Sequence, residues 1–318
     1  MLSALPALTQ PPAAAATASM RAVSTLRYAH HAPQAAAAMP DVEKLRRDLL
    51  RRLNDLRATT GTPPLRLSPA LDRAAQQHVD ELAASGSLRR EHRPEQAMDE
   101  RLREAGYDAH QWAENVMSGP VDAAELVSAW RADDTDGTFR RVLDPVYSDL
   151  GIGVGRLGGA PLYSILFASP QSEAFARETA DLRDLGRVRG ELLARIDAER
   201  RRDRRQPLSL NAQLDQAAQR HAEDMLARSY FAHRSPDGKT VRERSRAAGY
   251  QWAAIGENLA EGQQSVDEVV EAWMRSRGHR ENVLDRRYTE TGFGLALGRD
   301  PKKGEYRILW VETFGLPR

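Results

Sequence analysis

The feature that most constrains this chain is an internal duplication. Residues 67–78 read Leu-Ser-Pro-Ala-Leu-Asp-Arg-Ala-Ala-Gln-Gln-His, and residues 210–221 read Leu-Asn-Ala-Gln-Leu-Asp-Gln-Ala-Ala-Gln-Arg-His. The two segments are offset by 143 residues, as His78 and His221 are, and the offset shortens to 141 near the end of each copy. A period this long indicates a repeated domain, because the units of a solenoid hold roughly 20 to 50 residues. Each copy must therefore bury a core of its own.

The length of 318 residues suits two domains, since a domain usually holds about 100 to 200 residues. We expect a leader over residues 1–40, a first copy over 41–170, a connector over 171–185 and a second copy over 186–318. The first forty residues are rich in alanine and proline and have few branched apolar side chains. We interpret them as a disordered leader, either an export signal or a simple tail.

The charge balance and the lack of cysteine exclude several classes of partner and site. The 46 basic and 45 acidic side chains leave a net charge of +1, so no global field attracts nucleic acid. With no cysteine there are no disulfides, thiolate metal sites or cysteine nucleophiles. No apolar run approaches the roughly 20 residues that span a bilayer, so we expect no transmembrane segment. For the arginine-rich stretch 200–205 we favour a solvated helix end over an anion-binding surface.

Hydrophobic periodicity predicts an α+β fold in both copies. Leucines at three- and four-residue steps predict an amphipathic helix over residues 41–59. Ser68 and Asn211 are typical N-cap residues at the starts of two further helices. We interpret His221 as a packed helix residue rather than a ligand. In the second copy we also predict helices over 240–248 and 265–277, a strand or extended segment over 255–260, and a strand pair near the C-terminus.

Polar motifs gather in the second copy. His233 lies in Ala-His-Arg-Ser-Pro, and Glu257 in Gly-Glu-Asn-Leu. His279 lies in Gly-His-Arg-Glu-Asn-Val-Leu, and Glu290 in Tyr-Thr-Glu-Thr-Gly. Imidazole and carboxylate groups are usual ligands of zinc and similar ions, and they also serve as general acids and bases. We therefore predict one ligand cleft formed by His233, Glu257, Asn258, His279, Asn282 and Glu290.

The order of these motifs, with Val-Val-Glu-Ala-Trp and Trp-Val-Glu-Thr-Phe-Gly, resembles the bacterial branch of the CAP superfamily. That superfamily, also called SCP-like, includes cysteine-rich secretory proteins, antigen 5 and pathogenesis-related 1 proteins. The resemblance implies a three-layer α-β-α sandwich of the CAP type, here in two tandem copies, and an exported protein. It also implies a cleft in which histidine and glutamate can bind a metal. His233 and Glu257 are similar to the family's first histidine and its glutamate, whereas Arg287 stands at the position of the second histidine of eukaryotic members.

Two classes of function are compatible with this site. The first is a binding module whose cleft holds a small ligand, a lipid, a cell-wall fragment or a divalent ion. His233 and His279 are then the metal ligands if zinc or calcium binds. The second is a hydrolase that uses Glu257 and Glu290 as its carboxylates, or a metal-bound water. We favour binding because no nucleophile with its base is visible. A third possibility is a purely structural or adhesive tandem pair, which clefts filled by side chains such as Arg287 and Trp252 would favour.

The first copy keeps only part of the predicted cleft. Glu114 and Asn115 match Glu257 and Asn258, whereas Thr138, Arg141 and Asp149 replace His279, Asn282 and Glu290. His92 matches His233 only after a local gap. We therefore predict that the second copy performs the function and that the first is a degenerate partner.

Overall fold

The computed structural model describes residues 39–86, 94–119, 122–132 and 137–318. The predicted leader and His92 lie outside these residues, apart from Met39 and Pro40. The chain divides into two compact units, Met1–Ala174 and Phe175–Arg318. Helix α6 (Gln171–Glu178) contains the point of division and is followed by a 3-10 turn, η1 (Ala180–Leu182).

The first unit is built on one four-stranded sheet in the order β1-β3-β4-β2. Strand β1 pairs with β3 in parallel, and the other pairs are antiparallel. The strands are β1 (Arg66–Leu67), β2 (Ala109–Ser118), β3 (Asp149–Leu157) and β4 (Ala160–Pro170). The helices are α1 (Val42–Thr59), α2 (Pro69–Ser85), α3 (Pro94–Glu104), α4 (Ala123–Ala132) and α5 (Thr138–Val142).

The second unit repeats this plan, with its strands in the order β5-β7-β8-β6. Strand β5 is parallel to β7, and the pairs β7–β8 and β6–β8 are antiparallel. The strands are β5 (Ser209–Leu210), β6 (Trp252–Glu261), β7 (Glu290–Arg299) and β8 (Tyr306–Pro317). The helices are α7 (Leu185–Arg202), α8 (Ala212–Ala227), α9 (Val241–Ala247), α10 (Val266–Arg275) and α11 (Arg277–Val283).

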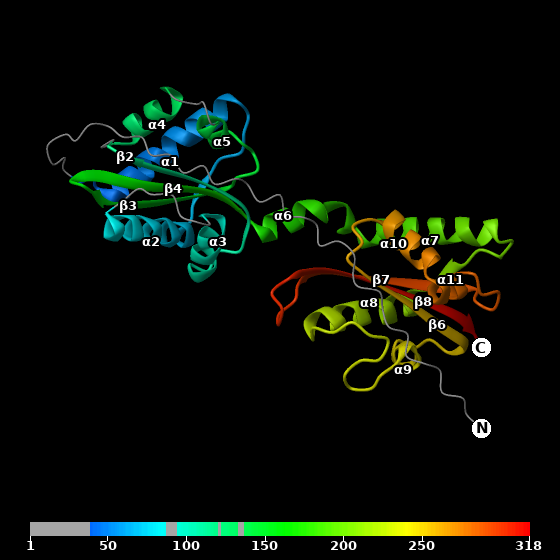
Figure 1. Cartoon of the computed structure of the whole chain (residues 1–318). Helices are drawn as coiled ribbons and strands as arrows, with labels where there is room; N and C mark the ends of the chain where they lie inside the picture. Colours follow the sequence, from blue (N-terminus) through cyan, green and yellow to red (C-terminus); the bar gives the residue numbers. More distant parts are fainter. Residues whose placement is uncertain (1–38, 87–93, 120–121, 133–136) are drawn as a thin grey trace. The chain divides into compact units, whose positions relative to one another are not determined.

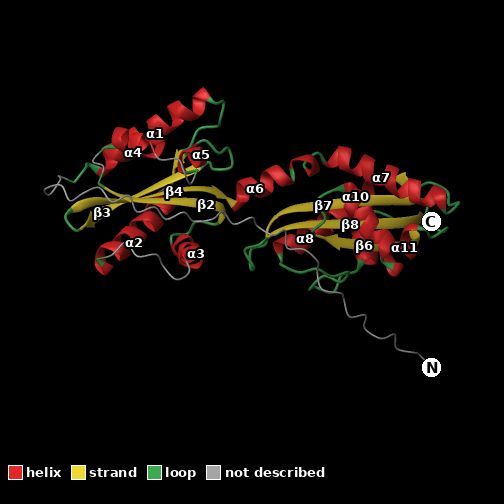
Figure 2. Ribbon diagram, turned by 45° about the horizontal axis from the view of Figure 1, so that its top comes forward, coloured by secondary structure: helices red, strands yellow, loops and turns green. Residues whose placement is uncertain are grey.

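Each unit is a three-layer α-β-α sandwich, which confirms the predicted fold class (Figures 1 and 2). In the first unit, α1, α4 and α5 cover one face of the sheet, and α2 and α3 cover the other. In the second, α7, α10 and α11 lie opposite α8 and α9. Separate apolar clusters fill the two interfaces of the second unit, one around Trp273 and Trp310 and one around Met225 and Leu309. Each copy therefore buries its own core.

Repeated glycines explain how closely a helix approaches each sheet. A Cβ atom on Gly153 would lie 2.4 Å from the backbone carbon of Ala75 in α2, and one on Gly294 would lie 2.3 Å from that of Ala218 in α8. No side chain fits at such distances, so both positions require glycine. The glycines of the duplicated strands are thus a packing device of the fold.

A buried arginine in each unit joins the end of the first helix to the segment before the central strand. We call Arg57 and Arg200 the arginine clamps. Both side chains are fully buried, and each donates only to backbone carbonyls. The acceptors are Pro63, Val142, Asp144 and Tyr147 in the first unit and Gln206, Val283, Asp285 and Tyr288 in the second. The expectation of a solvated helix end is therefore wrong for Arg200, because the carbonyls replace water around its guanidinium.

Most predicted element boundaries agree with the structure. Asp41, Ser68 and Asn211 accept hydrogen bonds from backbone N–H groups in the first turns of α1, α2 and α8. The helix predicted over 265–277 ends at Arg275, and a further helix that was not predicted, α11, follows it directly. This difference matters for function, because α11 carries His279 and Asn282.

Candidate functional site

The centre of the candidate site is the carboxylate of Glu257 on the edge strand β6. Its side chain is only 3% exposed. One carboxylate oxygen lies 2.9 Å from Nδ1 of His233, and the other lies 2.5 Å from a guanidinium nitrogen of Arg244 in α9. A buried carboxylate is stable when such partners compensate its lost hydration. Both oxygens of Glu257 are thus already engaged within the protein.

Arg244 also fixes the loop that carries His233. Its other terminal nitrogen donates to the backbone carbonyls of His233, at 3.1 Å, and of Lys239, at 3.0 Å. The arginine therefore binds the histidine's backbone and the histidine's carboxylate partner together. Sequence reasoning did not single out Arg244. The duplication offered a signal, because Arg101 precedes it by the same 143 residues as the other matches.

His233 presents the exposed side of this assembly. Its side chain is 61% exposed, although its Nδ1 atom contacts the buried Glu257. A carboxylate accepts hydrogen bonds, so Nδ1 carries the hydrogen and Nε2 is left as the outer nitrogen. The imidazole is therefore held in one orientation with its second nitrogen available to solvent or to a ligand.

His279 lies on α11 and interacts electrostatically with His233. Burial lowers the pKa of His279, and the nearby His233 lowers it further. Both effects disfavour the charged form, so His279 is neutral at neutral pH. Two predicted cleft residues that come from different elements thus influence each other's charge.

Two asparagines hold α11 against strand β6. The side-chain nitrogen of Asn258 donates to the carbonyl of His279 at 3.1 Å. The side-chain nitrogen of Asn282 is 2.9 Å from Oδ1 of Asn258 and 3.2 Å from the carbonyl of Glu257. Asn258 is fully buried, so its role is to position the helix that carries His279. The prediction placed both asparagines in the site, and the structure gives them this positioning contact.

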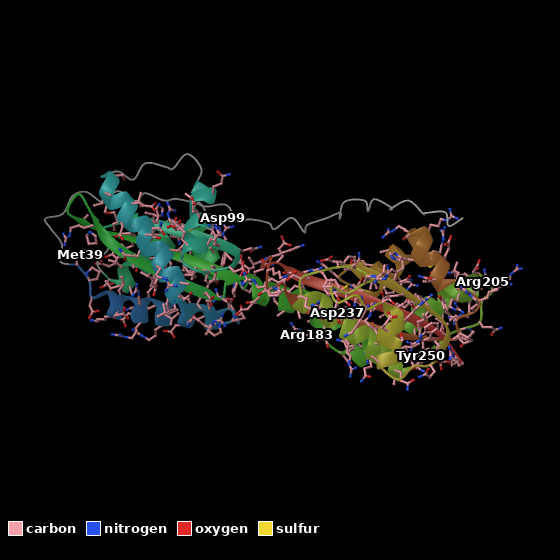
Figure 3. The ribbon with its side chains drawn as sticks, turned by 90° about the horizontal axis from the view of Figure 1, so that it is seen from below. Met39, Asp99, Arg183, Arg205, Asp237 and Tyr250 are labelled. Atoms are coloured by element: carbon pink, nitrogen blue, oxygen red, sulfur yellow. The ribbon has the colours of Figure 1, made fainter. Side chains whose placement is uncertain are left out.

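Glu290 is separated in its contacts from the other five predicted residues. It begins strand β7 and accepts a hydrogen bond of 2.6 Å from the hydroxyl of Tyr250. Tyr250 is labelled in Figure 3. In the first unit Tyr107 donates to Asp149 at 2.8 Å in the equivalent arrangement. The pairing therefore belongs to the common scaffold. Arg287, at the position of a family histidine, is exposed and hydrogen-bonded to Asp285.

His221 lies behind Glu257 and is nearly fully buried. Its Nε2 atom is 3.1 Å from the carbonyl of Ala232 and 3.9 Å from the nearer Glu257 oxygen. Burial lowers the pKa of His221 from 6.5 to about 4, and the charge of Glu257 opposes this shift only in part. A neutral, hydrogen-bonded imidazole fits the packed helix residue that we predicted.

The first unit closes the equivalent position. Glu114 is 1% exposed, and one of its carboxylate oxygens lies 2.6 Å from both Nδ1 of His78 and Oγ of Ser164. Arg101, which matches Arg244, instead donates to Glu81 at 2.8 Å. In the described part of the first unit, the imidazole that contacts this carboxylate is therefore buried, unlike that of His233.

The residues that the structure describes include no group of three or more His, Cys, Asp or Glu side chains placed to hold a metal ion. His233 and His279 provide two imidazoles, whereas protein zinc sites use three or four protein ligands. The described residues therefore do not fit the metal that the family resemblance implied. Over the same residues, no helix has the length and apolar character needed to cross a membrane.

The family model described as "CAP: Cysteine-rich secretory protein family" matches residues 50–164 and 193–314. The uncharacterized protein YkwD of Bacillus subtilis (strain 168) is 37% identical over 118 residues, which make up 37% of this chain and 43% of that protein. The chain thus spans less than half the length of this relative.

Two similar solved structures come from other bacteria. An extracellular protein containing a SCP domain from Bacillus anthracis is 18% identical, with a TM-score of 0.38 over 52% of this chain and 59% of that one. A cysteine-rich secretory protein from Staphylococcus aureus is 24% identical, with a TM-score of 0.34 over 40% of this chain and 38% of that one.

Proposed function

The chain belongs to the cysteine-rich secretory protein (CAP) family, and from this premise we propose that it is an exported binding module whose second unit holds a small polar ligand. The proposed cleft lies at β6 and comprises His233, His279 and the buried Glu257 that orients the first of them. Export is supported by the extracellular and secretory proteins to which the chain is similar.

The proposal rests on the contrast between the exposed side chain of His233 and the buried carboxylate that it contacts. His233 is 61% exposed, yet its Nδ1 atom contacts a carboxylate whose side chain is 3% exposed. Exposed polar side chains on loops normally sample several rotamers, and ordering them costs entropy when a ligand binds. A pre-oriented imidazole reduces that cost, which is what a binding residue requires.

The chemistry of the site favours an organic ligand with hydroxyl or amide groups. The outer nitrogen of a neutral imidazole accepts hydrogen bonds, and such groups donate them. Among the candidate ligands, a cell-wall fragment made of sugar and peptide has many such donors. A divalent ion is less well supported, because a third ligand from the described residues is missing.

No observation favours the hydrolase. Both oxygens of Glu257 are already hydrogen-bonded, to His233 and Arg244, and one oxygen of Glu290 accepts from Tyr250. A general base must have the reacting proton within hydrogen-bond reach. We therefore propose binding as the function of this site.

Calorimetry on the full chain tests the proposal. A soluble muropeptide, a fatty acid, Zn²⁺ and Ca²⁺ would each be titrated into the native protein and into His233→Ala, Glu257→Gln and Glu114→Gln. We expect the muropeptide to bind, and His233→Ala and Glu257→Gln each to weaken binding by about tenfold, the size of one lost hydrogen bond. The matched control Glu114→Gln should bind like the native protein. Equal loss in Glu114→Gln, or binding of none of the four probes, would contradict the proposal.

A further inference from the structure

Six further arginines lie near the arginine clamp of the second unit in the chain, and three of them, Arg202, Arg205 and Arg287, form ion pairs with Glu199, Asp203 and Asp285. Arg201, Arg202 and Arg204 are exposed at the end of α7, and Arg286 and Arg287 are exposed just before β7. Arg205, half-buried, adjoins them and is labelled in Figure 3. We call these six residues the basic patch.

The clamp itself brings the two halves of the patch together. Arg200 donates to the carbonyls of Gln206, at 2.8 Å, and of Asp285, at 3.0 Å. The segment after α7 and the segment after α11 are therefore held side by side. Their arginines form one surface although about 80 residues separate them in the chain.

The first unit shows that the scaffold works without these charges. Around its clamp, the residues at the corresponding positions are Ala58, Thr59, Gly61, Thr62, Pro145 and Val146. The carbonyl acceptors of the clamp are nevertheless arranged in the same way. Outside the clamps, segments 199–205 and 285–287 carry six positive and three negative side chains, whereas segments 56–62 and 144–146 carry one negative side chain. The clamp of the first unit therefore forms without these charges, and the second unit keeps a net local charge of +3 after its ion pairs are counted.

One arginine of the patch occupies a backbone conformation that favours glycine. Arg204 has a φ of 55°, and the matching Gly61 has a φ of 69°. Side chains other than glycine, asparagine and aspartate rarely adopt this left-handed region, at a cost on the order of 1 kcal/mol. Retaining arginine there, where the other unit has glycine, indicates that the charge serves a purpose other than folding.

We propose that the basic patch docks the second unit on an anionic membrane surface. Clusters of four to eight arginines or lysines are typical of segments that bind acidic lipid headgroups. Leu210, four residues after Gln206, is one of two exposed large apolar side chains among the described residues, and it adds an apolar contact beside the patch. No aromatic side chain is among those two, so the surface lacks the stacking platform that single-stranded nucleic acids use. This inference does not depend on the proposed ligand cleft.

Co-sedimentation with vesicles tests the proposal on the full chain. The vesicles would contain either phosphatidylcholine alone or equal parts of phosphatidylglycerol and phosphatidylcholine. The test variant is Arg201→Ala/Arg202→Thr/Arg204→Gly, which installs residues of the first unit and leaves Arg200 in place. The matched control is Arg47→Ala/Arg51→Ala/Arg52→Ala, which removes three exposed arginines from α1.

We expect the native chain and the control to bind the acidic vesicles, in a salt-sensitive manner, and to leave the neutral vesicles unbound. The test variant should bind the acidic vesicles about fivefold more weakly for each arginine removed. Its melting temperature should be at least that of the native chain, because glycine relieves the φ of Arg204. Native binding that is absent, equal on both vesicles or equally weakened in the control would overturn the proposal. Binding to DNA or heparin without vesicle binding would overturn it as well.

Discussion

The two units differ most where their scaffolds are most alike. Each places a buried glutamate at the same position of its edge strand, Glu114 in β2 and Glu257 in β6. In the first unit a serine and a histidine enclose the carboxylate. In the second an arginine and an exposed histidine hold it. The described part of the first unit thus encloses its buried glutamate, whereas in the second unit the buried glutamate contacts an exposed histidine.

The largest effect that we expect is on the stability of each unit, and it tests the arginine clamp that the two units share. Replacing Arg57 or Arg200 by methionine leaves four backbone carbonyls without their donor, and each change should destabilise its own unit by about 3 to 5 kcal/mol. Hydrogen exchange measured by mass spectrometry would follow α2 and α8 separately. If Arg200→Met left the exchange of α8 unchanged, the clamp would not be a structural element of the scaffold.

A smaller effect concerns acid sensitivity of the second unit. The pKa of His221 is lowered from 6.5 to about 4 in the fold, so the unfolded chain binds more protons between these values. The stabilising contribution is complete above pH 6.5 and is lost as the pH falls towards 4, by on the order of 3 kcal/mol in total.

His221→Gln checks this assignment, because glutamine can still donate to the carbonyl of Ala232 but does not titrate. The native chain should show unfolding free energies that decline from pH 6.5 to 4 by more than those of the variant. Parallel declines in both proteins would show that His221 is not the responsible group.

The smallest predicted effect is the loss of stability when Asn258 or its match in the first unit, Asn115, is replaced. Asn258→Ala leaves the carbonyl of His279 and the amide of Asn282 without a partner and should cost about 2 kcal/mol. In the described part of the first unit, neither side-chain polar atom of Asn115 has a hydrogen-bond partner. Asn115→Ala should therefore cost less, below about 1 kcal/mol. Urea unfolding of the two variants would measure the difference, and a larger cost at Asn115 would reverse our account of the pair.

The sequence predicts much of the scaffold because its signals are local or repeated. Apolar periodicity and the capping residues Ser68 and Asn211 predict helices that the structure confirms. The buried clamp Arg200 was not predicted, because an arginine run at a helix end gives no sign of which member turns inward. Helix α11 was missed because it is short and follows α10 directly.

The candidate site was predictable only in part. The motifs pointed to His233, Glu257 and His279, which the structure places around β6. The separate contact of Glu290 with Tyr250 depends on long-range geometry that no motif records. Arg244 was missed because the duplication shows only that arginine occupies both positions. It does not show that Arg101 donates to Glu81 and Arg244 to Glu257.

The central claim is that, among the residues that the structure describes, only the second unit exposes a histidine of this polar centre to a ligand. Modification of the full chain by diethyl pyrocarbonate, mapped by mass spectrometry, tests it directly, since the reagent reacts with accessible imidazoles. The side chain of His233 is 61% exposed, whereas His78 and His221 are each 1% exposed. We predict rapid modification of His233, slowed by a bound muropeptide, and protection of His78 and His221. Modification of His78 as fast as His233 would contradict the account.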